Sequence, residues 1–509
     1  MAILPIHLPD ASWYPAKGDR ATLFLRFIAR RFLVFGILIA FVLFTISRMF
    51  YGREAFLEIS GTSQERQHSR WPGVRLPPLY SRYHQYELAL PQHHWHATSH
   101  EDEPKFFFVP GHTWGLGWGN AMQEILLNAY LSYKSNRANE RHSRFVFYNY
   151  TWNMDPSQDY SDYSGKPIPS RVPLSALIAV NHIIRIEGPI VGGAFPDGQH
   201  APFAIAEEYY RTICEGRKRV LDREEIHKEI GSSMVDPITK GWVQKLSTVD
   251  DQCVEVARGQ DGGIYTWIIF GEKDAMHDVW ADFAASPIIT HFRWSPLVEL
   301  AFDNNREVFA PTTVFEAPLS TIPYAVPSAQ RYAMMKGLLA LHIRRGDYAV
   351  HCDGLANWSS SFLSFNSLQG LETFRIPEGG GWGENTPENI AIYRRHCFPT
   401  VEQIVARVSE VLRSESARGL ESVYIMTNGA VPWVEELKTA LLNTGSFKHV
   451  SSSRDTVLNW EQKYVAQAMD MLVGQRAQVF IGNGWSSVTG GVVVMRQANG
   501  FHPDSTRFF

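Results

Sequence analysis

The chain has 509 residues, 45% of them hydrophobic and 20% charged, which is ordinary for a folded protein and enough for two or more domains. Its formal net charge of −4 excludes the strongly basic balance of proteins that bind nucleic acid or an anionic membrane surface. The four cysteines have no CxxC or other metal-type spacing, so they predict no metal site.

The N-terminus predicts a membrane anchor. Residues 32–51 begin with FLVFGILIAFVLFTI, an apolar run that spans a bilayer once its flanking residues are counted. Five basic residues precede the run, against Arg48 and Arg53 after it, so the positive-inside rule places residues 1–31 in the cytosol and the remainder in a lumen. A cleaved signal peptide is the alternative, but its apolar core would be shorter and no A-x-A site follows. Residues 52–103, rich in His, Arg, Pro and Ser, predict a stem.

The four cysteines and two sequons agree with a lumenal location. An even cysteine count in an oxidising compartment favours disulfides, for which Cys352–Cys397 is the first expected pairing and Cys214–Cys253 the second. Four cysteines allow three pairings, and the sequence does not choose among them. The sequons at Asn149 and Asn357 predict glycosylation sites and agree with a lumenal location.

The first globular part is expected over 104–330. A short apolar strand at 105–110 runs into GHTWGLGWGN at 111–120, and a helix with its apolar face on one side follows. Strand, glycine-rich loop and helix are typical of nucleotide sites, because glycines admit close backbone approach and a helix start offers N–H groups to an anion. The loop has neither the P-loop GK[ST] nor the dinucleotide spacing, and a plain tight turn is the alternative.

The middle of the chain is less regular. Strands are predicted at 144–148 and 265–270, one or two helices within 209–230, and a Pro- and Ser-rich loop at 151–175. Four prolines between 311 and 327 predict a domain boundary near residue 330.

The second globular part, 331–509, starts with LLALHIRRGDY at 338–348. The apolar run predicts a buried strand that delivers charged side chains to its carboxyl end, where open α/β sheets bind ligands. Two guanidinium groups there suit a diphosphate, because each can bond two oxygens at once. The alternative is a surface arginine pair bound to Asp347.

Strands and helices then alternate after a long predicted insertion at 349–383. Helices are expected at 401–412, 432–442, 461–476 and 486–496, and strands at 423–427, 448–451 and 479–482. This alternation predicts right-handed βαβ units and a parallel, Rossmann-like sheet. At the last strand-to-helix junction, Ser486, Ser487 and Thr489 are either ordinary helix caps or a second anion site.

Three stretches together resemble the GDP-fucose protein O-fucosyltransferase-like superfamily, with wording closest to its fungal members. They are GLGWGNAMQE at 115–124, HIRRGDY at 342–348, and FIGNGWSSVTGGVVVMR at 480–496 with Asp470 ten residues before Phe480. The resemblance implies an α/β GT-B fold, in which two Rossmann-like domains face a cleft, with the acceptor nearer 104–330 and the GDP-sugar on 331–509. It also implies inverting transfer of L-fucose from GDP-β-L-fucose to a hydroxyl of a protein or glycan, without a cofactor or essential metal.

The resemblance assigns roles to matching residues. Arg344 would hold the β-phosphate and stabilise the departing GDP, with Arg345 as a second phosphate contact or an orienting contact. His342 would contact the nucleotide, and Asp470 would contact guanine or ribose. The phosphate would be bound by Ser486, Ser487 and Thr489. Beneath the donor would lie Gly117, Gly119 and Asn120, with Asn120 near the fucose and acceptor.

The general base is where the chain departs from the pattern. Some relatives carry a Glu in the glycine-rich loop, where this chain has Gly117, Trp118 and Gly119. Glu124, one turn into the helix, is the catalytic candidate, and a capping or solvated Glu is the alternative for this residue. Asp347 is the other candidate base, although a neighbouring Arg would depress its pKa, and a missing base does not exclude activity. The competing functions are transfer of another GDP-sugar and a catalytically silent GDP-sugar- or glycan-binding membrane protein. The anchor implies a single-pass type II protein of the Golgi or ER membrane.

Overall fold

The computed structural model describes residues 70–94, 104–112, 114–139, 143–179, 204–258, 263–311, 316–323, 326–379 and 385–509. The predicted cytosolic tail, membrane helix and most of the stem lie outside these residues. Within the described ranges, no helix is both long and apolar enough to cross a membrane. The chain divides into two compact units, 1–74 and 75–509, and the fold below belongs to the second.

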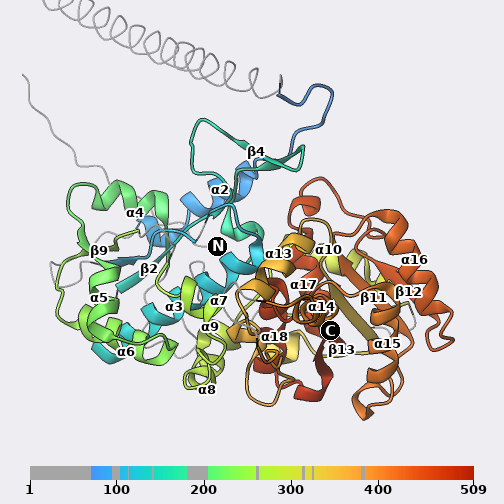
Figure 1. Cartoon of the computed structure of the whole chain (residues 1–509). Coiled ribbons are helices and arrows are strands. Elements are labelled where there is room, and N and C mark those ends of the chain that lie inside the picture. The colour runs from blue at the N-terminus through green and yellow to red at the C-terminus, as the bar shows by residue number, and fades with distance from the viewer. Residues whose placement is uncertain are drawn as a thin grey trace, which may run out of the picture. The chain divides into compact units, whose positions relative to one another are not determined.

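Two parallel five-stranded sheets form the framework of residues 75–509 (Figure 1). The first sheet has the order β7-β2-β1-β9-β8, in which every neighbouring pair is parallel. Its strands are β1 (Lys105–Phe108), β2 (Ser143–Phe147), β7 (Ile205–Ala206), β8 (Arg219–Leu221) and β9 (Cys253–Val256). Its helices are α3 (Trp118–Asn139), α4 (Glu207–Cys214), α5 (Arg223–Ile230), α6 (Val235–Ser247), α7 (Thr266–Gly271), α8 (Trp280–Ala285) and α9 (Pro287–Thr290), with α2 (Ser81–Leu88) before β1.

The second sheet has the order β12-β11-β10-β13-β14, again entirely parallel. Its strands are β10 (Met335–Ile343), β11 (Ser422–Thr427), β12 (His449–Ser452), β13 (Ala477–Gly482) and β14 (Thr506–Phe508). The helices that follow in this half are α13 (Tyr348–Asn357), α14 (Pro387–Cys397), α15 (Val401–Val411), α16 (Val431–Leu442), α17 (Ala466–Arg476) and α18 (Ser487–Ala498). The predicted α/β class with parallel sheets is confirmed.

The strand order has a consequence for ligand binding. In chain order the second sheet reads 3-2-1-4-5, so the connection reverses direction between β10 and β13. Open α/β sheets bind ligands outside the carboxyl ends of the strands at such a switch point. In the first sheet the same reversal lies between β1 and β9, which places the glycine-rich loop after β1 at an equivalent position.

Two predictions about local structure were wrong. Residues 265–270, expected as a strand, form helix α7, because its apolar run buries one face, including Ile268 and Ile269, while Trp267 is 64% exposed. The expected loop at 349–383 contains helix α13.

The region between the sheets also differs from its prediction. The expected loop at 151–175 carries two small antiparallel pairs, β3 (Tyr150–Thr151) with β6 (Arg171–Val172) and β4 (Tyr160–Tyr163) with β5 (Lys166–Pro169). Three further helices connect the sheets, namely α10 (Pro296–Asn304), α11 (Arg306–Phe309) and α12 (Ser328–Arg331). Residues 75–509 form one compact unit. The domain boundary expected at 330 stays a prediction.

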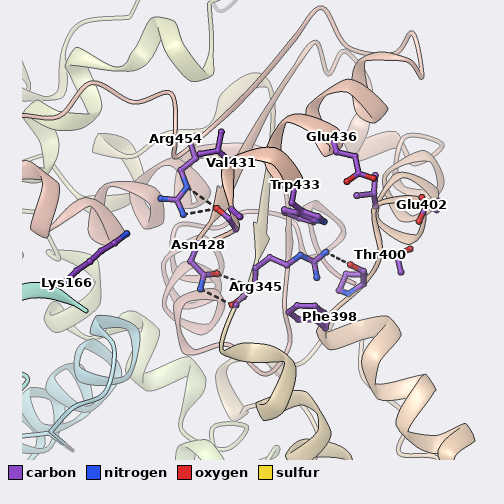
Figure 2. A pocket seen from close by; sticks show the side chains of 15 residues that line it. Lys166, Arg345, Phe398, Thr400, Glu402, Asn428, Val431, Trp433, Glu436 and Arg454 are labelled. Atoms are coloured by element: carbon purple, nitrogen blue, oxygen red, sulfur yellow. Dashed lines mark hydrogen bonds between the residues drawn. The ribbon is translucent and has the colours of Figure 1, made fainter. Parts of the chain in front are cut away.

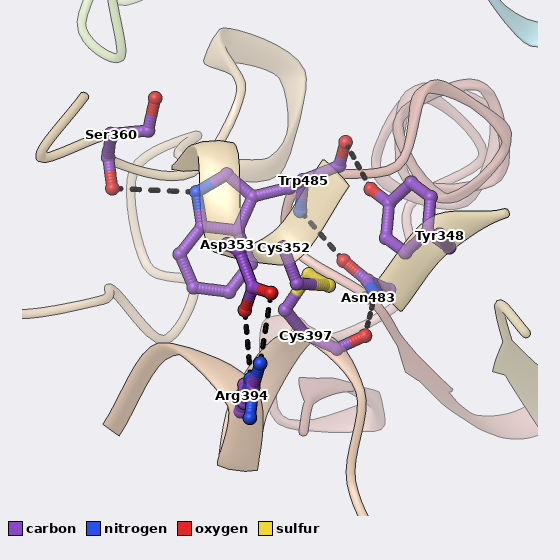
Figure 3. Close-up of a disulfide and its surroundings, with 8 residues drawn as sticks. All are labelled: Tyr348, Cys352, Asp353, Ser360, Arg394, Cys397, Asn483 and Trp485. Carbon is purple, nitrogen blue, oxygen red and sulfur yellow. Dashed lines mark hydrogen bonds and ion pairs between the residues drawn. A yellow bond between two sulfur atoms is a disulfide. The ribbon is translucent and has the colours of Figure 1, made fainter. Parts of the chain in front are cut away.

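Both expected disulfides are present. Cys214, at the end of α4, bonds Cys253 at the start of β9, and Cys352 in α13 bonds Cys397 at the end of α14. Figure 3 shows the second bond beside an ion pair between Asp353 and Arg394, whose closest atoms are 2.7 Å apart. Together these links tie α13, which follows the charged loop of β10, to α14.

Candidate active site

A large cavity lies at the two switch points. It has a volume of about 1350 Å³ and is lined from both halves of the unit, by the glycine-rich loop and the start of α3 on one side and by the loops after β10 and β13 on the other. We call it the central cavity. Of the residues predicted from the sequence, Gly117, Asn120, Arg344, Ser486 and Ser487 line it. A single cavity therefore brings together three stretches that are far apart in the sequence.

The starts of α3 and α18 meet at this cavity. A Cβ on Gly119, the second residue of α3, would lie 2.6 Å from the backbone N of Val488 and 2.7 Å from the carbonyl carbon of Ser487. Gln123 also donates a hydrogen bond from Nε2 to the Ser487 carbonyl oxygen at 2.6 Å. Because the first N–H groups of a helix have no partner within the helix, two converging helix starts form an anion-binding arrangement. Gly119 is the residue whose lack of a side chain allows this approach.

Arg344 brings one of the two permanent positive charges that line the central cavity, the other being the more exposed Lys273. Arg344 follows the last residue of β10, its side chain is 22% exposed, and its Nη2 lies 3.2 Å from Asp347, which is 64% exposed. The guanidinium also lies over the ring of Tyr348 at 5.0 Å. Its Nε is buried and makes no hydrogen bond within the part of the chain that the structure describes. The group is thus oriented by neighbours but retains donors for an anionic ligand.

His342 and Thr489 bind each other and do not line the cavity. The His342 Nδ1 and Thr489 Oγ1 atoms are hydrogen-bonded at 2.8 Å, and Oγ1 also accepts from the backbone N–H of Asn483 at 3.1 Å. Burial, together with the nearby Arg344, lowers the pKa of His342 to about 3, so its ring is neutral. The pair joins the end of β10 to the start of α18. Their predicted donor contacts stay predictions.

Asp470 lies one turn behind the cavity wall. Gln467, in the first turn of α17, lines the cavity, whereas the Asp470 carboxylate accepts from the Tyr424 hydroxyl at 2.6 Å and the Ser453 hydroxyl at 2.9 Å. Burial raises the pKa of Asp470 to about 6 even though both hydroxyls lower it. The predicted contact of Asp470 with guanine or ribose stays a prediction.

Arg345 points away from Arg344. Its guanidinium lies between the rings of Phe398 and Trp433, at 4.3 and 4.0 Å, and donates to the carbonyl of Pro399. Burial lowers its pKa to about 10. It lines a second, separate cavity, so the structure does not bring the two arginines to one site.

The catalytic base is not identified by the cavity lining. Glu124 is 1% exposed and lies near Gly263, whose added Cβ would be 3.1 Å from its Oε2, and it does not line the central cavity. The carboxylates that line it are Asp347 and Glu272. A catalytic role for Glu124 stays a prediction.

The sequence-based reasoning missed an aromatic rim. Trp267, Trp358 and Tyr163 are 64%, 46% and 41% exposed, and all three line the central cavity. Trp358 belongs to the sequon of Asn357, which is itself exposed at the end of α13, whereas Asn149 is half-buried. Within the described ranges, no group of three or more His, Cys, Asp or Glu residues could hold a metal ion.

The comparison with protein-family models agrees with the resemblance seen in the sequence. The family model described as GDP-fucose protein O-fucosyltransferase matches residues 298–499. Solved structures that match include POFUT1 in complex with GDP, at 16% identity and a TM-score of 0.41, covering 80% of this chain and 97% of that one. POFUT1 in complex with GDP-fucose matches at 15% identity and 0.41, covering 80% and 97%, and the apo form at 15% and 0.40, covering 82% and 99%. Among curated proteins, none matches the sequence.

Proposed function

Because the family model of GDP-fucose protein O-fucosyltransferases matches residues 298–499, we propose that the chain is a glycosyltransferase that moves L-fucose from GDP-β-L-fucose to an acceptor hydroxyl. The observation that supports this most directly is the shared cavity of Arg344 and the starts of α3 and α18. A pyrophosphate bound there meets the guanidinium of Arg344 and two sets of helix N–H groups. The acceptor, a protein or a glycan, enters from the side of the aromatic rim.

The proposed mechanism rests on stabilising the leaving group. As the bond between the anomeric carbon and GDP breaks, negative charge grows on the β-phosphate. Arg344, held by Asp347 and Tyr348, is already oriented toward the cavity, so its attraction for that charge strengthens without reorganisation. Attack of the acceptor from the opposite face gives inversion, and Asn120, which lines the cavity on the first half, positions the sugar and the acceptor.

The test is release of GDP from GDP-fucose by the purified protein. Arg344→Ala is expected to lower this rate by about 10²–10³, as removing one oxyanion donor does in other enzymes. Arg344→Lys keeps the charge but not the two-pronged geometry, and an intermediate loss is expected. The matched control is Arg418→Ala, since Arg418 is 81% exposed and pairs only with Glu415 in the described structure.

Two outcomes separate the alternatives. Thermal stabilisation by GDP without turnover would identify the silent GDP-sugar-binding protein, and turnover with a different GDP-sugar would identify another donor. Unchanged turnover in Arg344→Ala would reject the proposed site. Turnover that survives EDTA is expected, in keeping with the implied absence of an essential metal.

We further propose the single-pass type II topology, with the catalytic part in the lumen of the ER or Golgi. The apolar run at 32–51 and the two disulfides support it, since disulfides persist in oxidising compartments. Sensitivity of the protein to a glycosidase that removes N-glycans, lost when Asn357 and Asn149 are both changed to Gln, is the expected result. An unglycosylated, protease-accessible protein in sealed microsomes would contradict it.

A further inference from the structure

The second cavity, which we call the Arg345 cavity, has a volume of about 840 Å³ and lies where β10 and β11 end and α15 and α16 begin (Figure 2). It shares only Asn428 with the central cavity. The proposed transfer reaction gives it no role, yet it lies at the carboxyl edge of the sheet, where parallel α/β folds bind ligands.

Three cations line the Arg345 cavity, and two of them are held in fixed positions. Arg345 is 7% exposed and lies between two aromatic rings, and its Nε is buried without a hydrogen-bond partner in the described structure. Arg454 donates to the carbonyl of Gly429 from Nε and Nη2, at 3.2 and 2.9 Å. Lys166 extends from β5 toward Arg454 (Figure 2).

Arg345 and Lys166 form no ion pair with a carboxylate among the described residues, and Arg454 has only the longer-range attraction of Asp470, whose pKa it lowers. Two glutamates line the same cavity. Both glutamates are exposed, and the start of α15 lowers the pKa of Glu402 through its own backbone N–H and the Thr400 hydroxyl. A buried guanidinium without a counter-ion is costly, and an oxyanion in the cavity would offset that cost.

A helix start adds to the attraction for an anion. Helix α16, with twelve residues, begins at Val431, and its N-cap residue Ala430 has no side chain to satisfy the first N–H groups. Val431 is 57% exposed and lines the cavity together with Trp433. The site therefore combines positive charge and free backbone donors with an apolar wall.

We propose that the Arg345 cavity binds a phosphate or sulfate group of a ligand other than the sugar donor. Lys166 and Arg454 contact its oxygens directly, and Arg345 supplies positive charge from behind. The group comes either from an anionic acceptor sugar or from a free oxyanion. An acceptor sugar in the central cavity would lie near this site, because the β4–β5 hairpin that carries Lys166 also lines the central cavity with Tyr163 and Ile168.

The experiment is calorimetric titration of inorganic phosphate into the intact protein saturated with GDP, which blocks the central cavity. One site with a Kd of about 1 mM is expected. Arg454→Gln and Lys166→Gln should each weaken binding about tenfold, because each removes one charged hydrogen-bond donor. Arg418→Gln should leave it unchanged, and none of the three should change the affinity for GDP.

Lys166→Gln keeps the test decisive if Arg454→Gln disturbs the Gly429 loop, because the Lys166 side chain is exposed and only the backbone of Lys166 takes part in the β4–β5 pairing. The titration is repeated in Arg344→Ala, so the result does not depend on the donor site. Tighter binding of galactose 6-sulfate than of inorganic sulfate would identify an acceptor sugar as the source of the group. Equal binding of the two would identify a free oxyanion as the source. Either result supports the site. Absence of phosphate binding in the GDP complex, or binding unchanged in both variants, overturns the proposal.

Discussion

Replacing Gly119 with alanine should push apart the two helix starts at the floor of the central cavity. The new Cβ would lie 2.6 Å from the Val488 nitrogen, 2.7 Å from the Ser487 carbonyl carbon and 2.9 Å from the Ser487 hydroxyl oxygen. Two of these atoms are backbone, so a change of side-chain rotamer cannot relieve the contact. Overpacking of this kind costs about 1–3 kcal/mol, against a gain of up to about 1 kcal/mol for alanine over glycine in a helix, which leaves a net loss of between about 0 and 3 kcal/mol.

The neighbouring Gly117 provides the control. Its nearest atoms are those of the Gln467 side-chain amide, at 3.9 and 4.0 Å, so an added Cβ has room. Neither glycine has a positive φ, so backbone strain does not distinguish them. The assays are thermal unfolding and GDP affinity. Gly119→Ala should unfold at a lower temperature than Gly117→Ala. It should also bind GDP more weakly than the unaltered protein, because moving the Ser487–Val488 backbone displaces the α18 N–H groups assigned to phosphate.

A Gly119→Ala variant that unfolds at the same temperature as Gly117→Ala and binds GDP as tightly as the unaltered protein would refute this reasoning. It would mean that α3 and α18 can separate without loss, and that their convergence does not form the phosphate site. A stability loss without an affinity loss would also count against the site, because the contact would then be one of packing alone.

Two further predictions concern pH and the disulfides. His342 has a pKa of about 3 in the folded chain and 6.5 ordinarily, so the unfolded chain takes up a proton first and the stability should fall as the pH drops below about 6.5. The His342→Gln variant should therefore lose less Tm than the unaltered chain between pH 7 and pH 5. The disulfides close loops of 45 and 39 residues, each stabilising the chain by about 4 kcal/mol, so changing Cys352 and Cys397 to Ser should lower the Tm as much as changing Cys214 and Cys253. Only the change of Cys352 and Cys397 should weaken GDP binding, and equal losses of GDP affinity would contradict this.

The second sheet could be predicted because its buried strands are apolar runs separated by amphipathic helices. The strands expected at 423–427 and 479–482 are β11 and β13, with ends shifted by a residue or two. The same rule failed at 265–270, because a short apolar run with β-branched residues fits a buried helix turn as well as a strand. Helix α13 escaped prediction because its pattern is weak and it lies next to the charged loop.

The central cavity could be predicted only in part. Arg344 and Ser486 both follow strands, and the alternation of strands and helices placed them at one sheet edge. Arg344 and Arg345 were expected to act together, but successive side chains leaving a strand point in opposite directions, so one faces the central cavity and the other the Arg345 cavity. The bond between His342 and Thr489 depends on the distance between two elements, which no local pattern encodes.

The contact between α3 and α18 also limits how the protein can admit its substrates. Each helix belongs to a different sheet, and Gly119 brings the backbone of one against the other at the base of the cavity. A hinge motion of one half against the other would break this contact along with the phosphate site. Substrates are therefore expected to enter and leave at the mouth, which residues of the β4–β5 hairpin and the aromatic rim line, without separation of the two helix starts.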